Sequence, residues 1–165
     1  MKCYAMTFDG ALLERGFWLY VWRITHESRC VLYVGRTGDS SSPHASSPFK
    51  RIVQHLDPRP SAKANALGRH LKRLGLPIED STFEMVAVGP IFPEQEDMAR
   101  HRVFRDQAAA LECALAEYLR AAGYEVVGVH PRAGACDSTL YEEICRIVDQ
   151  RIALREEGRG NGRAR

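Results

Sequence analysis

The chain has 165 residues, 45% of them hydrophobic, and a formal net charge of +2. This size and composition predict one globular domain with a real core, and the small net charge alone indicates no class of partner. The five cysteines form no Cys-x-x-Cys pair, and no run of about 18 apolar residues occurs, which argues against a disulfide framework, a zinc knuckle, export and membrane insertion. We therefore expect a soluble, cytoplasmic protein with free thiols and no membrane partner.

Residues 17–35 predict a β-hairpin. Apolar and aromatic residues dominate 17–24 and 31–35, and the polar run between them predicts a turn that joins antiparallel strands. With the turn centred between His26 and Glu27, Tyr20 would lie opposite Tyr33. Every even loop length keeps these two tyrosines on the same face of the sheet, because side chains alternate along a strand.

A polar loop over residues 39–47 and two helices follow the hairpin. Ser47 as the cap and Pro48 in the first turn predict a helix that ends before Pro58. A second, basic helix is expected over residues 62–74, closed by a glycine.

The second half of the chain predicts one more strand, two helices and an edge strand. A strand is expected over residues 82–88, and a long amphipathic helix over 94–122. A short edge strand follows at 124–129. A final helix over 139–154 opens with the capping-box spacing of Thr139 and a glutamate three residues later.

Together these elements predict an α/β domain over residues 1–156. Its sheet is expected to be small, mainly antiparallel and three-stranded or slightly larger, with helices flanking it. The basic tail at residues 157–165 is predicted to be disordered.

Positive charge is concentrated in one stretch. Residues 49–75 contain seven Lys and Arg against Asp57 alone, whereas residues 76–99 contain six acids and no Lys or Arg. Such a stretch is typical of a surface that follows nucleic-acid phosphates, because each neutralised phosphate releases counterions. The alternative is an ordinary solvated helix face.

Glu112 occupies an unusual position in the long helix. It lies four residues after Ala108 and three before Leu115, at the margin of the apolar face. A charge in this position is costly without a partner. On its own, this pattern is best explained by a surface residue or a salt-bridge partner.

Several short motifs occur in an order that resembles the GIY-YIG nuclease family. That family carries one tyrosine in each of two strand motifs, then an Arg, a His or Tyr four residues later, and a helical Glu. The matching residues, spread over about 95 positions, are Trp18-Leu19-Tyr20, Tyr33-Val34-Gly35, Arg51 with His55, and Glu112. Trp18 stands where the family usually has glycine. The resemblance implies the GIY-YIG fold and a metal-dependent endonuclease that hydrolyses phosphodiester bonds in DNA, with RNA as an open alternative.

The resemblance also implies a role for each residue. One Mg²⁺ or Mn²⁺ ion would bind Glu112 together with several waters. Arg51 would clamp the non-bridging phosphate oxygens with its planar guanidinium. Tyr20 would be the base or would orient the water, with a pKa lowered by the metal and Arg51. His55 would relay that proton, and Tyr33 would bind phosphate or orient the water.

Substrate contacts are expected at the end of the second strand and in the basic stretch. Gly35 would let the backbone approach a phosphate closely. The predicted substrate-binding residues are Gly35, Arg36, Thr37, Lys50, Lys63, Arg69, Lys72 and Arg73. Because the chain is short, we expect specificity from the 39–47 loop, the basic helix, a homodimer or a recognition partner.

Two alternatives stay open, because each residue taken singly also has an ordinary structural explanation. The first is a nucleic-acid-binding module that keeps the fold and has lost hydrolysis, and the second is an adaptor that uses the sheet as a scaffold. One departure bears on the first: family members commonly have Asn after a Tyr about a dozen residues beyond the metal-binding Glu, and here Glu125 follows Tyr124. We expect that Glu125 does not bind metal and that His130 is a candidate substitute donor.

Overall fold

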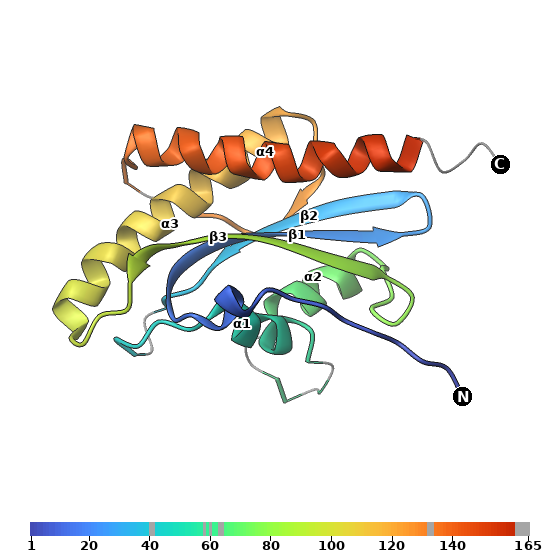
Figure 1. The fold of residues 1–165 in the computed structure, drawn as a ribbon, viewed down its shortest axis with the longest axis horizontal. Coiled ribbons are helices and arrows are strands. Elements are labelled where there is room, and N and C mark those ends of the chain that lie inside the picture. The colour runs from blue at the N-terminus through green and yellow to red at the C-terminus, as the bar shows by residue number, and fades with distance from the viewer. Residues whose placement is uncertain (40–41, 58, 60, 63–64, 132–133, 161–165) are drawn as a thin grey trace.

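The computed structural model describes the chain except for residues 40–41, 58, 60, 63–64, 132–133 and 161–165, and it describes side chains of the last helix only as far as Ile152. In chain order the elements are a short 3-10 helix η1 (Gly10–Leu13), β1 (Gly16–His26), β2 (Arg29–Arg36), α1 (Pro48–His55), α2 (Ala66–Arg73), β3 (Thr82–Pro93), α3 (Met98–Ala121), β4 (Val126–Val127) and α4 (Ser138–Gly160). Figure 1 shows three layers, with α3 and α4 on one side of the sheet and α1 and α2 on the other.

The sheet has four strands in the order β3-β1-β2-β4. β1 is antiparallel to both β2 and β3, whereas β4 runs parallel to β2. The α/β class is confirmed, and the sheet is mixed. β3 was expected to end before Gly89, but it continues through Pro90 to Pro93.

The register of the hairpin differs from the predicted one by two residues. A two-residue turn joins the strands, and its first residue, Glu27, has φ 51°, which places it in the left-handed region. Tyr20 consequently pairs with Gly35 and not with Tyr33. A shift of two residues preserves parity, so both tyrosines lie on the same face, as predicted.

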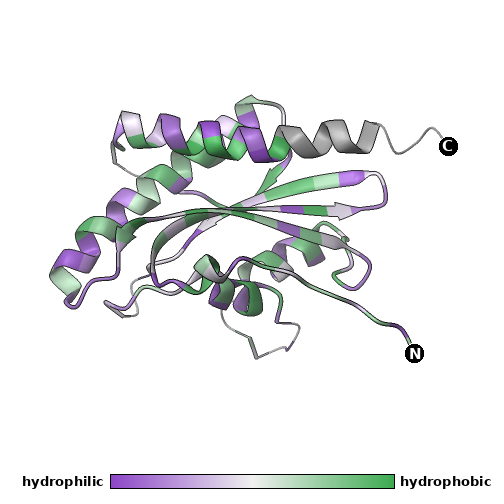
Figure 2. Ribbon diagram, viewed as in Figure 1, coloured by the Kyte–Doolittle hydropathy of each residue, from purple (hydrophilic) through white to green (hydrophobic). Residues whose placement is uncertain are grey.

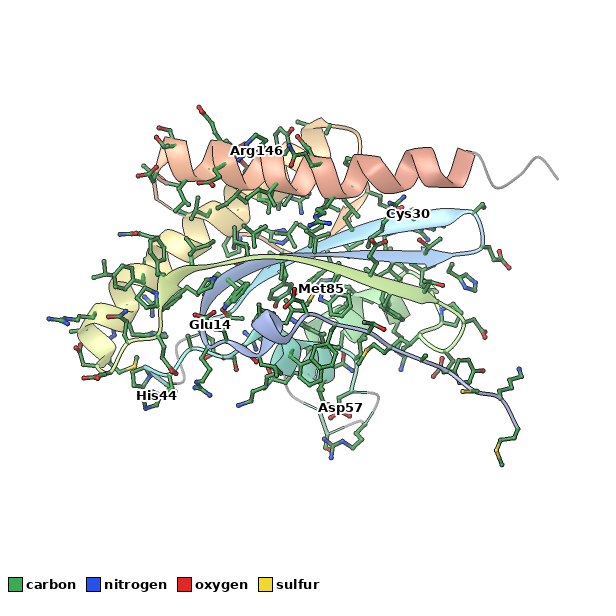
Figure 3. All side chains as sticks on the ribbon, viewed as in Figure 1. Glu14, Cys30, His44, Asp57, Met85 and Arg146 are labelled. Atoms are coloured by element: carbon green, nitrogen blue, oxygen red, sulfur yellow. The ribbon has the colours of Figure 1, made fainter. Side chains whose placement is uncertain are left out.

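Alternate residues of the hairpin enter two separate cores. Leu19 and Val21 pack against α3 and α4, whereas Tyr20 and Trp22 pack against α2 and the end of α1. The strands and the sheet-facing sides of the helices are mostly hydrophobic in Figure 2. Figure 3 shows side chains filling both spaces between the layers, with Met85 of β3 on the α2 side of the sheet.

The ends of the helices follow local capping chemistry. Ser47 caps α1 as predicted, since its hydroxyl accepts a hydrogen bond from the N–H of Lys50. α3 begins later than expected, because Asp97 provides its cap. At α4, the side chain that caps the first turn is Asp137, not Thr139.

α2 covers a shorter stretch than the predicted 62–74, and α4 extends beyond the predicted end at Leu154 into the first residues of the expected tail. The rest of that tail, residues 161–165, lies outside the described residues. No helix in the described part of the chain is long and apolar enough to cross a membrane. All five cysteines are free thiols.

Candidate active site

A mostly polar cavity of about 320 Å³ lies at the C-terminal end of β2. The residues that line it are Tyr20, Tyr33, Arg36, Asp39, Arg51, His55, Ala66, Arg69 and Glu112. All five residues predicted to act in catalysis are among them, although they come from β1, β2, α1 and α3. The structure thus brings the predicted set together.

The cavity lies where the sheet is incomplete beside β2. β4 pairs with β2 only as far as Tyr33, so on that edge the described part of the chain places no strand beside β2 from Val34 onwards, while β1 continues along the other edge. Arg36 pairs with Leu19 and shares the sheet face that α3 covers, whereas Tyr33 lies on the other face. Glu112 of α3 can therefore line the same cavity as side chains from the opposite face.

Tyr20 is almost completely buried, with 1% of its surface exposed. Its ring covers Gly35, where a Cβ atom would come within 2.5 Å of the ring. Its hydroxyl oxygen is 2.7 Å from Nε2 of His55 and 3.3 Å from the carbonyl oxygen of Arg36. Burial raises the pKa of the Tyr20 hydroxyl above its ordinary value, and Arg51 opposes this effect only in part. Arg51 thus lowers this pKa, as expected, but by less than burial raises it, and the lowering expected from a bound metal ion stays a prediction.

His55 is a buried neutral imidazole. Burial first, and Arg51 second, lower the pKa of His55 to about 4. Because a carbonyl only accepts, Tyr20 donates to the Arg36 carbonyl while its oxygen accepts the Nε2–H of His55. In the alternative arrangement Tyr20 donates to Nε2, and the ring proton lies on Nδ1, which has no partner among the described residues. The first arrangement leaves no donor unpaired and is favoured.

Tyr33 lies beside the same histidine. Its ring centroid is 5.3 Å from that of His55 and 6.1 Å from that of His70. Burial first, and the charge of Glu112 second, raise the pKa of Tyr33 to about 12. Both site tyrosines are therefore protonated at neutral pH.

Arg51 lines the cavity and has a buried donor without a partner among the described residues. Its Nη1 donates to Oε1 of Gln54 at 3.0 Å, and its Nη2 is 3.8 Å from Oδ2 of Asp39. Its Nε is buried and has no hydrogen-bond partner among the described residues. An unpaired buried donor is costly, and an anionic ligand in the cavity would satisfy it.

Glu112 is partly buried and paired. Its Oε2 accepts a hydrogen bond from Nε of Arg36 at 3.0 Å, and 21% of each side chain is exposed. Burial raises the pKa of the Glu112 carboxyl, while Arg36 and then Arg51 oppose this shift. The predicted position at the margin of the helix is confirmed, because its neighbours Leu111 and Cys113 are buried.

The donor set fits only one kind of metal site. Among the described residues, no three His, Cys, Asp or Glu side chains gather closely enough to hold an ion. Glu112 is a single carboxylate, and Asp39 is a second one on the cavity wall. Mg²⁺ and Mn²⁺ prefer oxygen ligands, and Mg²⁺ in particular keeps several waters when a protein supplies one or two carboxylates. These residues therefore fit one largely hydrated ion and not a closed protein cage.

Two of the predicted substrate contacts are structural. Thr37 is fully buried, and its hydroxyl accepts from the N–H of Trp18 and donates to the carbonyl of Gly16. It fixes the start of β1 and has no surface left for a substrate. Gly35 is required by the ring of Tyr20, so the close approach at this glycine is to a side chain and not to a phosphate.

The predicted basic contacts fall into two groups. Arg36 and Arg69 line the cavity. Lys50, Lys72 and Arg73 are exposed on α1 and α2 and do not line it. Lys63 lies outside the described residues.

The position of the missing asparagine is occupied by a different arrangement. Glu125 forms an ion pair with Arg29 at 2.6 Å and does not line the cavity. His130 donates its Nε2–H to the carbonyl of Val34 at 3.0 Å, and its Nδ1 accepts from Arg120. His130 thus supplies a side-chain donor beside the site strand, as the sequence suggested.

Two contributors were missed by sequence reasoning. Asp39 lines the cavity, and its only sequence signal is its place at the start of the polar loop. His101 of α3 is completely buried, with Nδ1 2.8 Å from the carbonyl oxygen of Pro43 and Nε2 2.6 Å from that of Asp39. His101 thereby ties the loop that carries Asp39 to α3.

Comparisons with protein-family models, with curated proteins and with solved structures found no match to this chain. The chemistry of the cavity and the order of the motifs are therefore what a functional inference has to rest on.

Proposed function

We propose that the protein is a metal-dependent endonuclease that hydrolyses phosphodiester bonds in DNA through a GIY-YIG type of site. One observation carries the proposal: Tyr20, Tyr33, Arg51, His55 and Glu112 gather around a single cavity. Catalytic groups must converge on one reacting atom, and packing alone gives no reason for these five polar side chains to do so. Mg²⁺ or Mn²⁺ on Glu112 would act as a Lewis acid that neutralises developing charge on the phosphate.

The charge of the cavity suits a phosphodiester. Three arginines line it against the carboxylates of Asp39 and Glu112, so the wall carries a positive excess while His55 is neutral. Arg51 is one of the three, and its buried Nε has no partner among the described residues. A guanidinium held in place by Gln54 binds phosphate oxygens without first having to be ordered.

Tyr20 and His55 form a proton path. A water that attacks the phosphorus can pass its proton to Oη of Tyr20 only if that oxygen hands its own proton onwards. Nε2 of His55, at 2.7 Å, is the acceptor within reach in molecules whose imidazole is the tautomer with its proton on Nδ1. The lowered pKa of His55 makes this transfer unfavourable in the resting site, so it proceeds as negative charge builds up on the phosphate.

The proposed partner is DNA, with RNA as an alternative. Lys50, Lys72 and Arg73 are exposed on α1 and α2. They would contact phosphates of the DNA backbone on either side of the cleaved bond. Recognition would come from the 39–47 loop, α2, a second copy or another protein. The free thiols are in keeping with a cytoplasmic location.

A binding module without hydrolysis is the second candidate, and the Arg36–Glu112 ion pair favours it. In that pair the carboxylate proposed to hold metal is already neutralised by the protein. Binding that depends on salt but no cleavage with any divalent ion would select this candidate.

A plasmid assay distinguishes the nuclease from the binding module. Purified protein is incubated with supercoiled plasmid under three separate conditions: with Mg²⁺, with Mn²⁺ and with a chelator. The proposal expects nicked or linear product only with a divalent ion. An Arg51→Ala variant purified in the same way is the control for a contaminating nuclease. No product under any condition, or equal product from that variant, would overturn the nuclease assignment.

A further inference from the structure

Arg36 is held by two acceptors at the mouth of the cavity. Its Nε donates to Oε2 of Glu112 at 3.0 Å, and its Nη1 donates to the carbonyl oxygen of Gly38 at 2.5 Å. These acceptors come from α3 and from the loop after β2, which are 76 and 2 residues away in sequence. One guanidinium therefore bridges two elements of the site wall.

A divalent ion and this guanidinium compete for the same carboxylate. Arg36 and Glu112 are each about one-fifth exposed, so solvent screens a second cation beside them less than it would at the surface. An ion that approaches Glu112 meets repulsion from Arg36 as well as attraction from the carboxylate. The ion pair thus opposes metal binding as long as Arg36 stays in place.

A phosphodiester in the cavity removes this conflict. Arg36 lines the same cavity as Arg51 and Arg69, so its long side chain can reach a bound phosphate from its position at the end of β2. Transfer of the guanidinium from Glu112 to a phosphate oxygen leaves the carboxylate open. The same transfer replaces one ion pair of Arg36 with another, so the guanidinium is never left without a partner.

We propose that Arg36 is an exchangeable counter-ion that closes the Glu112 metal site until a phosphate ligand draws it away. The inference rests on the proposed function, because it assigns a regulation to that same site. It makes ion binding and phosphate binding mutually dependent, and such coupling is reciprocal by thermodynamic necessity. The protein by itself then holds divalent ions weakly, and the site assembles on the substrate.

The test is direct Mn²⁺ binding, measured by calorimetry at pH 8 without nucleic acid. The variants are Arg36→Gln, the matched control Arg69→Gln from the same cavity, and Glu112→Gln. Removing the competitor is expected to tighten Mn²⁺ binding about tenfold in Arg36→Gln. Arg69→Gln removes the same charge without opening Glu112 and is expected to change the affinity much less. Arg36→Lys, which keeps a cation in the wild-type position, is expected to fall between wild type and Arg36→Gln.

A second titration includes thymidine 3′,5′-bisphosphate, a phosphate ligand that has no diester to cleave. It should tighten Mn²⁺ binding more in the wild type than in Arg36→Gln, because only the wild type has a counter-ion to displace. Mn²⁺ binding that is unchanged or weaker in both Arg36→Gln and Arg36→Lys would overturn the inference while the metal site stands. Mn²⁺ binding that does not depend on Glu112 would overturn the metal site itself, and the inference with it.

Discussion

The two faces of the hairpin differ in kind although they belong to the same strands. On one face Leu19 and Val21 meet α3 and α4 in an aliphatic core. On the other, Tyr20 and Tyr33 meet α1 and α2 with hydroxyls and ring nitrogens among the apolar groups. Because side chains alternate along a strand, adjacent residues serve different purposes. One face provides stability, and the other carries the candidate chemistry.

Hydrogen bonding shows the same contrast. Four of the five buried side-chain polar atoms without a partner among the described residues belong to Trp22, Arg51, His55 and Asn65, which lie on the α1 and α2 side. Such groups reduce stability and are expected where a ligand completes the structure. The α3 and α4 side mixes its apolar core with paired polar groups, such as Tyr118 with Asp149.

The largest expected effect is on the site face. Arg51→Ala should lower cleavage about a hundredfold or more, because the guanidinium acts on charge that develops in the transition state. Its midpoint of urea denaturation should fall only a little, since the change removes one hydrogen bond to Gln54 and a long ion pair with Asp39 but also removes an unpaired buried donor. Nicking rates and denaturation curves of the same preparation give both values. A large loss of stability with little loss of cleavage would reverse the division between the faces.

The reciprocal change is Leu119→Ala on α3. Leu119 is fully buried in the aliphatic core, so its truncation should cost about 2–5 kcal/mol of the free energy of unfolding. Cleavage per folded molecule should be unchanged at a temperature where the variant is folded. Urea denaturation measures the first quantity, and an assay corrected for the folded fraction measures the second. Loss of activity in the folded variant would mean that the two faces are not separable.

His55 predicts a pH effect on the site face. Its pKa is about 4 in the folded protein and about 6.5 when unfolded, so the unfolded chain binds more protons between these values. Stability is therefore lost as the pH falls through this window, by about 2 kcal/mol between pH 8 and pH 5. Denaturation curves at the two pH values should show a smaller loss for His55→Phe. An equal loss in both proteins would assign the effect to other groups.

The smallest effect concerns Glu125, which lies outside the cavity. Glu125→Asn should keep or raise cleavage and should cost at most about 1 kcal/mol, because only the partly exposed pair with Arg29 is broken. Glu125→Gln is the control for loss of charge alone. Nicking rates and Mn²⁺ titrations of both variants are the measurement. If Glu125 were a second metal ligand, the folded Glu125→Asn protein would lose both cleavage and Mn²⁺ affinity.

Local patterns predicted what depends on local chemistry. The hairpin, the Ser47 cap and the shared face of the two tyrosines follow from alternation and capping, and all are confirmed. The register was missed because Glu27 adopts a left-handed conformation. Glycine and asparagine usually mark such positions, and neither occurs in this turn. The cap of the last helix was misplaced because Asp137 precedes Thr139 and offers a competing acceptor.

Long-range pairing could not be predicted. The sequence places Glu112 at the margin of its helix and shows that it needs a partner, but not that the partner is Arg36. The parallel pairing of β4 with β2, which ends at Tyr33, equally has no local sequence signal. The set of candidate residues was therefore available from the sequence, whereas the state of the carboxylate was not.

The most direct measurement of the central claim is the plasmid nicking rate of wild type and Glu112→Gln across a Mn²⁺ titration. The two proteins differ by one oxygen and one charge, so folding and DNA binding should change little. We predict that the rate of Glu112→Gln is at least about a hundredfold lower at every Mn²⁺ concentration. A rate within about threefold of the wild type throughout would contradict the claim that Glu112 and the residues around this cavity form a metal-dependent nuclease site.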